Sequence, residues 1–142
     1  MIQQPNYRFT NWAKNQTCTA SNFYQPETED EIIELLQKSN KIRIVGTGHS
    51  WNSICLNNDT LLNFDRYQKV LHLNKEKLSV TVQSGIKLWQ LNEYLDKEGL
   101  ALSNLGSISD QSLAGAISTA THGTGLNYKI LGSQIEEFSL IK

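Results

Sequence analysis

The sequence Ile42-Arg43-Ile44-Val45-Gly46-Thr47-Gly48-His49-Ser50-Trp51 places a short β-branched segment directly before a glycine-containing loop. Such a segment favours a strand over residues 42–45, and successive backbone N–H groups of the loop can point at a phosphate. The dinucleotide fingerprint of the Rossmann type needs a third glycine where Trp51 stands, and the Gly-Lys-Ser/Thr of a P-loop does not occur. A phosphate-binding loop and a plain surface turn are therefore both open interpretations of residues 46–51.

Helical and strand patterns alternate on both sides of this loop, which indicates an α+β fold. Before the loop, Thr28 begins a capping box that Glu31 closes by reaching back, so a helix is predicted from there to about Asn40. After the loop, a second helix is predicted over about 87–98, with Gly99 as its C-terminal cap. Further strands are predicted at residues 61–64 and 70–73 on either side of a turn at Asp65-Arg66, at 78–82 and at 135–141.

Composition and charge fit one ordinary globular domain and exclude several classes of protein. The chain has 142 residues, 39% of them hydrophobic, and its 13 basic residues face 14 acidic ones. No basic stripe is visible, so nucleic acid binding is not suggested. No apolar stretch approaches the length of a membrane span. Without a signal-peptide core, Cys18 and Cys55 fit two free thiols in a reducing cytosol, with one disulfide as the alternative. A cytoplasmic protein is therefore expected.

Residues 103–125 differ in character from the rest of the chain. They are rich in Gly, Ala, Ser and Thr, and Asp110 carries their only formal charge. Small residues let the backbone approach a ligand closely and offer many small hydrogen-bonding groups. The same composition also suits a helix packed tightly in a core, so composition alone leaves both interpretations open.

The histidines and cysteines do not predict a metal site. His72 lies in an alternating strand pattern, whereas His49 and His122 lie in loops rich in Gly and Thr. A zinc site that combined these two histidines with Cys18 and Cys55 would lack the close C-x-x-C or H-x-x-x-H spacing of known sites. A serine hydrolase is disfavoured as well, because no G-x-S-x-G elbow is present.

Four motifs that are modest alone become specific through their order and spacing: Asn11-Trp12-Ala13, residues 45–51, residues 99–107 and residues 114–125. Together they resemble the FAD-binding domain of the sugar-alcohol (alditol or xylitol) and aldonolactone oxidases, within the vanillyl-alcohol-oxidase superfamily. The resemblance covers essentially the whole chain. It departs from the family at Trp51, where phenylalanine is common. It implies that the chain is the N-terminal part of such a domain, of the p-cresol-methylhydroxylase type.

The resemblance also implies roles for individual residues. The loop that matches Ile44 to Ser50 wraps the FAD diphosphate, and His49 bonds covalently to the 8α-methyl carbon of the flavin. At the reacting centre, Ser107 faces both flavin and substrate, and Gly106 leaves dioxygen a path to the flavin. The implied FAD-contacting positions are Ile44, Val45, Gly46, Thr47, Gly48, His49, Ser50, Ser107, Ser112, Gly115, Thr119, Ala120, Thr121 and His122.

The implied organisation has a first subdomain over about residues 17–75 and the start of a second over about 76–142, with the substrate domain absent. The first would hold a small parallel β unit with its helix, and His49 would lie in the loop after its strand. The second would hold a mixed or antiparallel sheet that starts near Leu78 and is left open after Lys142. Such an open edge would invite self-association.

The implied reaction is the oxidation of a polyol or sugar lactone at a CH–OH group by FAD, with dioxygen as acceptor and hydrogen peroxide as product. The catalytic base and most substrate contacts of the family belong to the absent domain, so the 142-residue chain alone is expected not to turn over a substrate. The alternative from another class is an FAD- or nucleotide-binding module without catalysis of its own.

Overall fold

The computed structural model describes residues 1–141 and divides them into two compact units. The first unit comprises residues 1–67 together with 140–141, and the second comprises residues 68–139. Lys142, the predicted end of the second subdomain and of its open edge, lies outside the described residues. The predicted subdomains, about 17–75 and 76–142, stay a prediction beside this division.

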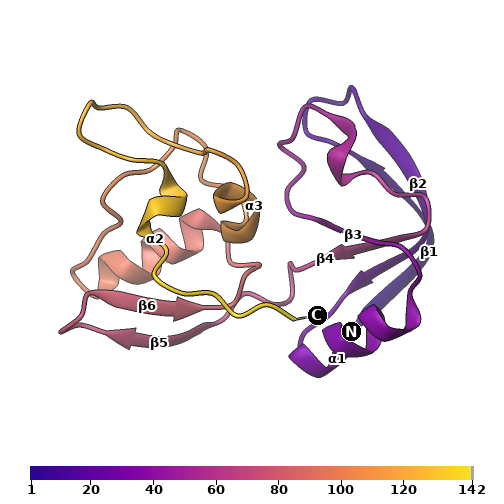
Figure 1. Cartoon of the computed structure of the whole chain (residues 1–142), viewed down its shortest axis with the longest axis horizontal. Coiled ribbons are helices and arrows are strands. Elements are labelled where there is room, and N and C mark those ends of the chain that lie inside the picture. The colour runs from indigo at the N-terminus through magenta and orange to yellow at the C-terminus, as the bar shows by residue number, and fades with distance from the viewer. Residues whose placement is uncertain (142) are drawn as a thin grey trace. The chain divides into compact units, whose positions relative to one another are not determined.

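The first unit is built on one four-stranded sheet in the order β1-β2-β4-β3 (Figure 1). Strands β2, β4 and β3 run parallel, and β1 pairs with β2 in the antiparallel sense. The predicted parallel unit with its helix, and with His49 in the loop after β3, is therefore confirmed. The elements of this unit are β1 (Ile2–Thr10), β2 (Thr17–Gln25), α1 (Glu29–Lys38), β3 (Ile42–Val45), the 3-10 turn η1 (Ser53–Cys55) and β4 (Thr60–Asn63).

The long hairpin of β1 and β2 was not predicted from the sequence patterns. Most of its side chains are exposed, and Phe9, Cys18, Ala20 and Phe23 are its buried residues. Cys18 and Ala20 keep the two-residue period of a strand, but Phe23 follows Ala20 by three residues. This break in the period removes the alternation by which a half-buried strand is recognised in a sequence.

Strand β4 is the centre of the first unit. It pairs with β2 on one side and β3 on the other, and the side chains of Leu61 and Leu62 are both 0% exposed. The predicted strand at 61–64 is thus found one residue earlier. The predicted strand at 70–73 is found as β5 (Val70–Asn74); it does not pair with β4, whose edges are both occupied, but with β6 (Ser79–Val82).

Helix α1 begins at the predicted cap residue, Thr28. The hydroxyl of Thr28 accepts a hydrogen bond from the backbone N–H of Glu31 at 3.3 Å. The Glu31 carboxylate reaches back as well: it accepts from the backbone N–H of Glu27 at 2.7 Å and from the N-terminal ammonium at 2.9 Å, and the backbone N–H of Thr28 adds a weaker interaction. These donors hold the pKa of the Glu31 carboxyl below its usual value.

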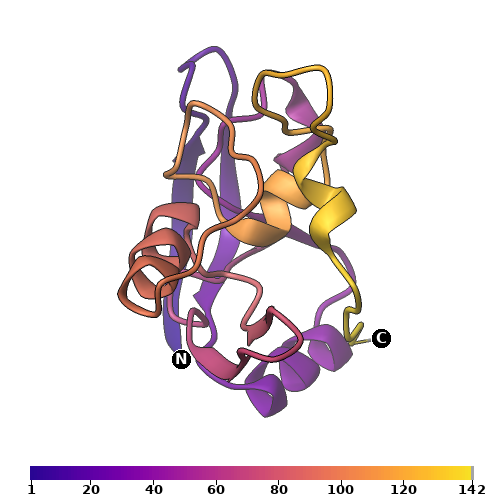
Figure 2. The ribbon, with the colours of Figure 1, turned by 90° about the vertical axis from the view of Figure 1, so that its left-hand side faces the viewer.

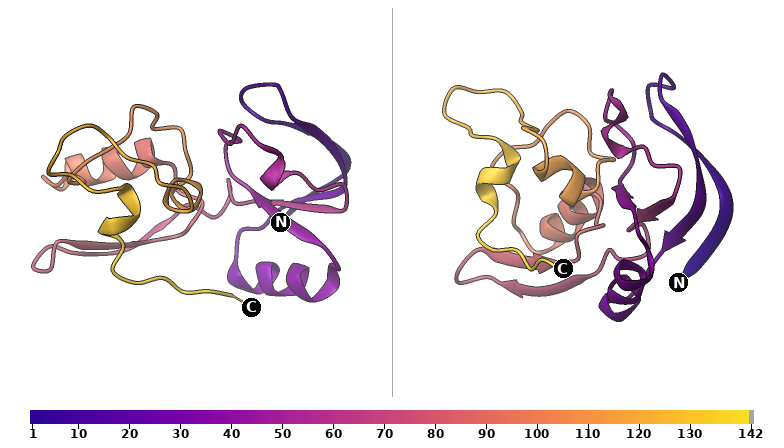
Figure 3. Two further views of the ribbon diagram at one scale, coloured as in Figure 1. Left: turned by 45° about the horizontal axis from the view of Figure 1, so that its top comes forward. Right: turned by 45° about the vertical axis from the view of Figure 1, so that its right-hand side comes forward.

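The second unit packs two helices and a 3-10 turn with the β5–β6 hairpin (Figure 3). Helix α2 (Leu88–Lys97) buries Leu91 and Leu95 against the hairpin, and Leu88 against Ala116 of α3 (Leu113–Ile117) and Leu131 of η2 (Leu131–Gln134). The predicted helix at 87–98 is confirmed, and Gly99 follows it with φ +73.

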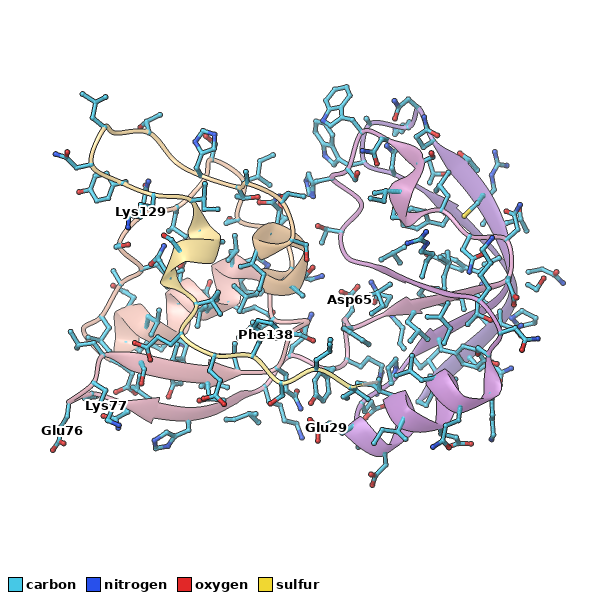
Figure 4. The ribbon with its side chains drawn as sticks, viewed as in Figure 1. Glu29, Asp65, Glu76, Lys77, Lys129 and Phe138 are labelled. Carbon is cyan, nitrogen blue, oxygen red and sulfur yellow. The ribbon has the colours of Figure 1, made fainter. Side chains whose placement is uncertain are left out.

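The second sheet begins earlier in the chain than predicted. It starts at Val70 and not near Leu78, because β5 supplies its first strand. Leu78 belongs to the connecting turn, with φ +52 and a side chain that is 72% exposed. In Figure 4, Glu76 and Lys77 mark this turn, and the side chain of Asn74 accepts hydrogen bonds from both of their backbone N–H groups.

The predicted strand at 135–141 is wrong. After η2 the chain is irregular, and Phe138 (labelled in Figure 4) and Leu140 have side chains that are 76% and 69% exposed. An isolated apolar run becomes a strand only where a neighbouring strand offers its edge. Within residues 1–141, no strand pairs with this segment. Among the same residues, no helix has the length and apolar character needed to cross a bilayer.

We predict that Thr28→Ala lowers the free energy of unfolding by about 1 kcal/mol, because a backbone N–H at the start of α1 loses its acceptor. Thr28→Ser keeps the hydroxyl and should retain most of the stability. Urea denaturation followed by circular dichroism measures both variants. Equal losses in the alanine and serine variants would contradict a role for the hydroxyl.

Candidate functional site

The loop after β3, residues 46–51, holds His49 and is called the histidine loop. The ring of His49 is half-buried, and its Nδ1 lies 2.9 Å from the hydroxyl of Thr47 in a hydrogen bond. The indole of Trp12 stacks on the imidazole with ring centroids 5.6 Å apart and an angle of 23° between the planes. One ring nitrogen and one face of His49 are therefore fixed by neighbours within the first unit.

Gly48 allows the histidine loop to pass close to the β1–β2 turn. Its φ is +75, and a Cβ at this position would lie 3.2 Å from the Phe9 ring and 3.4 Å from the Cα of Asn11. The carbonyl of Gly48 accepts the backbone N–H of Trp12 at 2.8 Å. Both the left-handed backbone and the close approach favour glycine here.

Asn11 joins the histidine loop to the turn between β1 and β2. Asn11 is 2% exposed, and its side-chain NH₂ donates to the carbonyl of Ser50 and to the side chain of Asn15, both at 2.8 Å. Its side-chain oxygen accepts the backbone N–H of Gln16 at 3.0 Å. Asn15 in turn donates to the carbonyl of Trp51 at 3.1 Å. The two asparagines hold the end of the loop through its carbonyls.

The backbone donors of the histidine loop are left free by this arrangement. Within the described part of the chain, the N–H groups of Thr47, Gly48, His49 and Ser50 donate no hydrogen bond. A run of unpaired N–H groups after a parallel strand is the arrangement that an anion such as a diphosphate can use. The geometry thus favours the phosphate-loop interpretation over the plain turn.

The carboxyl ends of the parallel strands are joined by Asn63. Its side-chain NH₂ donates to the carbonyl of Val45 at 3.2 Å, and its side-chain oxygen accepts from Gln25 at 2.8 Å. An open cavity of about 340 Å³ lies here, lined in part by Tyr7, Phe23, Gly46 and Asn63. Ligands of parallel sheets bind at this edge, so the histidine loop begins where a ligand is expected.

In the second unit, the small-residue stretch forms two segments that lie side by side (Figure 2). We call residues 103–107 the first segment and residues 119–123 the second segment. A Cβ on Gly106 would lie 3.4 Å from both the carbonyl oxygen of His122 and the Cγ2 of Thr121. Between the segments, α3 buries Ala116 completely. The packed-helix interpretation is therefore confirmed for α3, whereas close approach of the surrounding loops to a ligand stays a prediction.

The second segment also presents unpaired donors. The N–H groups of Thr119, Ala120 and Thr121 make no hydrogen bond within the described residues. The hydroxyls of Thr119 and Thr121 bond to each other at 3.1 Å, and Nδ1 of His122 lies 2.8 Å from the carbonyl oxygen of Gly123. Ser107 is exposed, and its hydroxyl has no partner among the described residues.

The predicted site residues divide between the two units. Ile44 to Ser50 belong to the first, and Gly106, Ser107, Ser112, Gly115 and Thr119 to His122 belong to the second. In the second unit, Gly106 lies against Thr121 and His122. Ser112 and Gly115 form a separate pair at the start of α3. Their role toward a cofactor stays a prediction.

Sequence reasoning missed the residues that hold these loops. The Asn11-Trp12-Ala13 motif was recognised without a role, and neither Asn63 nor Gln134 was singled out. Their partners lie 18 to 39 residues away in the chain, as in the bond from Asn11 to Ser50. A buried polar side chain must find a partner, but the sequence does not say which.

Within residues 1–141, the geometry indicates neither a reactive cysteine nor a metal site. Cys18 is buried, Cys55 is half-buried, and both are free thiols. Burial raises the pKa of the Cys55 thiol, which makes the reactive thiolate scarcer. Among residues 1–141, no group of three or more His, Cys, Asp or Glu side chains is placed to hold a metal ion.

A family model described as "FAD binding domain" matches residues 20–142. Among curated proteins, the chain is 40% identical over 139 residues to L-gulonolactone oxidase of Mus musculus, covering 95% of this chain and 32% of the relative. It is 36% identical over 144 residues to D-arabinono-1,4-lactone oxidase of Saccharomyces cerevisiae, covering 96% of this chain and 27% of the relative. The chain thus spans about a third or less of the curated relatives it matches.

Solved structures agree with the fold. Cholesterol oxidase from B. sterolicum superposes with a TM-score of 0.77 at 19% identity, covering 86% of this chain and 25% of that one. An alkyldihydroxyacetonephosphate synthase superposes with a TM-score of 0.68 at 22% identity, covering 78% of this chain and 22% of that one. At these identities the likeness is one of fold alone. The predicted α+β architecture of an FAD-binding domain is confirmed.

We predict that Asn11→Asp destabilises the protein by about 3 kcal/mol at pH 7, because a buried carboxylate then faces the Ser50 carbonyl in place of a donor. Burial raises the folded-state pKa of the introduced carboxyl, so the lost stability returns as the pH falls from 7 toward 4. Asn15→Asp, at an exposed position, is the control and should lose much less. Urea denaturation across this pH range measures both. A loss that grows on acidification would sink the assignment.

Proposed function

Because the chain belongs to the FAD binding domain family, we propose that it is the FAD-holding part of an oxidoreductase that oxidises a sugar lactone or a polyol at a CH–OH group. Dioxygen is the proposed electron acceptor, and hydrogen peroxide the proposed product. The observation that carries the proposal is the match over nearly the whole chain to relatives described as aldonolactone oxidases. Sugar lactones are for that reason the first substrates to test, and polyols the second.

The free backbone donors of both units support FAD binding. A diphosphate carries negative charge, yet the chain has a net charge of -1 and no basic stripe. Donors of the required kind are supplied by the unpaired N–H groups of residues 47–50 and 119–121. Small neighbouring residues leave the main chain open to a ligand, so binding does not depend on a strongly basic site.

We infer that His49 is the residue that carries the flavin covalently, through the 8α-methyl carbon. Its position within the loop of unpaired donors supports this role. The contacts from Thr47 and Trp12 restrict the rotation of its ring, which lowers the entropy lost when a bond is made to it. A freely rotating histidine in the same loop would lack this advantage.

Gly106 and Ser107 are proposed to act at the flavin ring. FAD supplies the hydride acceptor of the reaction when it is bound. Ser107 offers an exposed hydroxyl with no internal partner, which suits hydrogen bonding to a substrate hydroxyl. Gly106 has no side chain, and this lack of a side chain next to the flavin is the proposed reason that dioxygen can reach the ring. An ordinary serine hydroxyl does not accept protons near neutral pH, and the base is proposed to lie outside this chain.

The second candidate function is an FAD-binding module without catalysis of its own. The family model that matches residues 20–142 is described by FAD binding alone, which is compatible with such a module. The two candidates separate in an assay of the whole protein from its gene. Peroxide formation with an aldonolactone or with xylitol supports the oxidase, whereas bound FAD without turnover on any of them supports the module.

We predict that His49→Ala abolishes flavin fluorescence that resists acid denaturation, because the bond to the protein can no longer form. Wild-type and variant protein are loaded with FAD, precipitated with acid and viewed on a denaturing gel under ultraviolet light. His72→Ala, in β5, is the control and should keep the fluorescent band. A fluorescent band that persists in the His49 variant would rule out this residue as the anchor.

We predict that Gly106→Val slows reoxidation of the photoreduced protein by dioxygen, on the order of tenfold or more. A Cβ at this position already meets the His122 carbonyl oxygen and Thr121 Cγ2 at 3.4 Å, so the two γ-methyls of valine must project into the remaining space. Gly106→Ala should have a smaller effect, since one methyl fits at ordinary contact distance. Stopped-flow absorbance measures the rates, and equal oxygen reactivity in all three proteins would overturn the proposed role.

A further inference from the structure

The first and second segments of the second unit touch through their backbones. A Cβ on Gly123 would lie 2.2 Å from the carbonyl oxygen of Leu105 and 2.4 Å from the side-chain oxygen of Asn104. No side chain fits at such distances, so the contact requires glycine. Any displacement of the first segment therefore alters its contact with the second, and the position of Gly106 and Ser107 with it.

Very few hydrogen bonds hold the first segment in this position. Within the segment, the N–H of Leu105 donates to the side chain of Asn104 at 2.9 Å. From outside it, among the described residues, Gln134 alone forms hydrogen bonds to residues 103–107. The NH₂ of Asn104 is buried and has no partner among the described residues, so it adds nothing that would replace these bonds.

Gln134 uses both ends of its side-chain amide. Its oxygen accepts the backbone N–H of Ser103 at 3.0 Å, and its nitrogen donates to the carbonyl oxygen of Asn104 at 3.2 Å. A carboxylate of the same shape could make the first of these bonds but not the second. The pair of bonds fixes both the position and the direction of the chain at the start of the first segment.

The turn η2, which carries Gln134, is itself tied to the second segment and to the core. The N–H of Leu131 donates to the carbonyl of Thr121 at 2.8 Å. The Leu131 side chain is 3% exposed and packs with Leu88 and Ala116. One short turn thus holds the first segment through Gln134 and the second segment through Leu131.

We propose that Gln134 is a positioning residue for the flavin site, which sets the place of Gly106 and Ser107 relative to the second segment. This inference rests on the proposed function, in which those two residues face the flavin. Gln134 forms no hydrogen bond to Gly106 or Ser107 among the described residues and acts through the backbone of Ser103 and Asn104. Its loss should therefore change the surroundings of bound flavin while α2 and the hairpin stay packed.

The test compares Gln134→Ala, which loses both bonds, with Gln134→Glu, which keeps the acceptor and loses the donor. Ser133→Ala is the matched control, because the Ser133 hydroxyl bonds to the Ile130 carbonyl at 2.7 Å within the same turn and, among the described residues, forms no hydrogen bond to either segment. For Gln134→Ala we expect FAD to bind about tenfold more weakly in a fluorescence titration, from two lost hydrogen bonds. Gln134→Glu should fall between the alanine variant and the wild type.

A spectroscopic measurement separates positioning from mere loss of stability. At saturating FAD and below the unfolding temperature, the visible spectrum of bound flavin and its reoxidation rate should change in Gln134→Ala and stay unchanged in Ser133→Ala. A variant that is less stable but has the wild-type spectrum and reoxidation rate would overturn the proposal and leave the proposed function standing. A wild-type chain that takes up no FAD would contradict the proposed function itself, and this role with it.

Amide hydrogen exchange tests the clamp without FAD. The Ser103 amide should exchange about tenfold or more faster in Gln134→Ala, because its acceptor is removed, whereas the Leu131 amide should keep its protection. In Gln134→Glu the Ser103 amide should stay protected. Equal exchange at Ser103 in the wild type and the alanine variant would show that the bond does not hold the segment, and would overturn the proposal.

Discussion

The buried amide of Asn11 is the interaction on which the histidine loop depends. The loop leaves the N–H groups of residues 47–50 without internal acceptors, so those groups contribute nothing to its own stability. Its shape must then be fixed through carbonyls and side chains. Asn11 binds the Ser50 carbonyl, Asn15 binds the Trp51 carbonyl, and the Gly48 carbonyl accepts from Trp12. A loop that keeps its donors for a ligand is thus held by its acceptors.

In the second unit, a side-chain amide again holds a segment next to free backbone donors. Residues 119–121 leave their donors free, and Gln134 holds the neighbouring first segment from outside. An amide side chain is suited to this task because it both donates and accepts and carries no charge. A lysine or aspartate in its place would add a charge beside the proposed flavin site, and would supply one kind of bond only.

Local signals in the sequence predicted much of the fold, and the errors share one cause. The cap at Thr28, the strand before Gly46 and the helix before Gly99 are each encoded within a few residues, and each was found where predicted. The partner of β4, the hairpin of β1 and β2 and the fate of residues 135–141 depend on which edges are available in three dimensions. Site positions such as His49 came from resemblance. The roles of Asn11 and Gln134 could not be inferred locally, because their bonds reach over 39 and 31 residues of sequence.

The same geometry explains why the residues that support the loops matter more than any single donor. An exposed N–H is hydrated before a ligand arrives, so exchanging water for a phosphate oxygen contributes only about 0.5–1.5 kcal/mol in a typical case. Removing one such donor therefore costs only the free energy of one hydrogen bond. Removing Asn11 or Gln134 frees the backbone of a whole loop or segment. Its donors or small residues must then all be ordered again when the ligand binds. The energetic importance of a site built from main-chain groups therefore lies more in the amide side chains behind it, the buried Asn11 and the half-buried Gln134, than in any single group that would touch the cofactor.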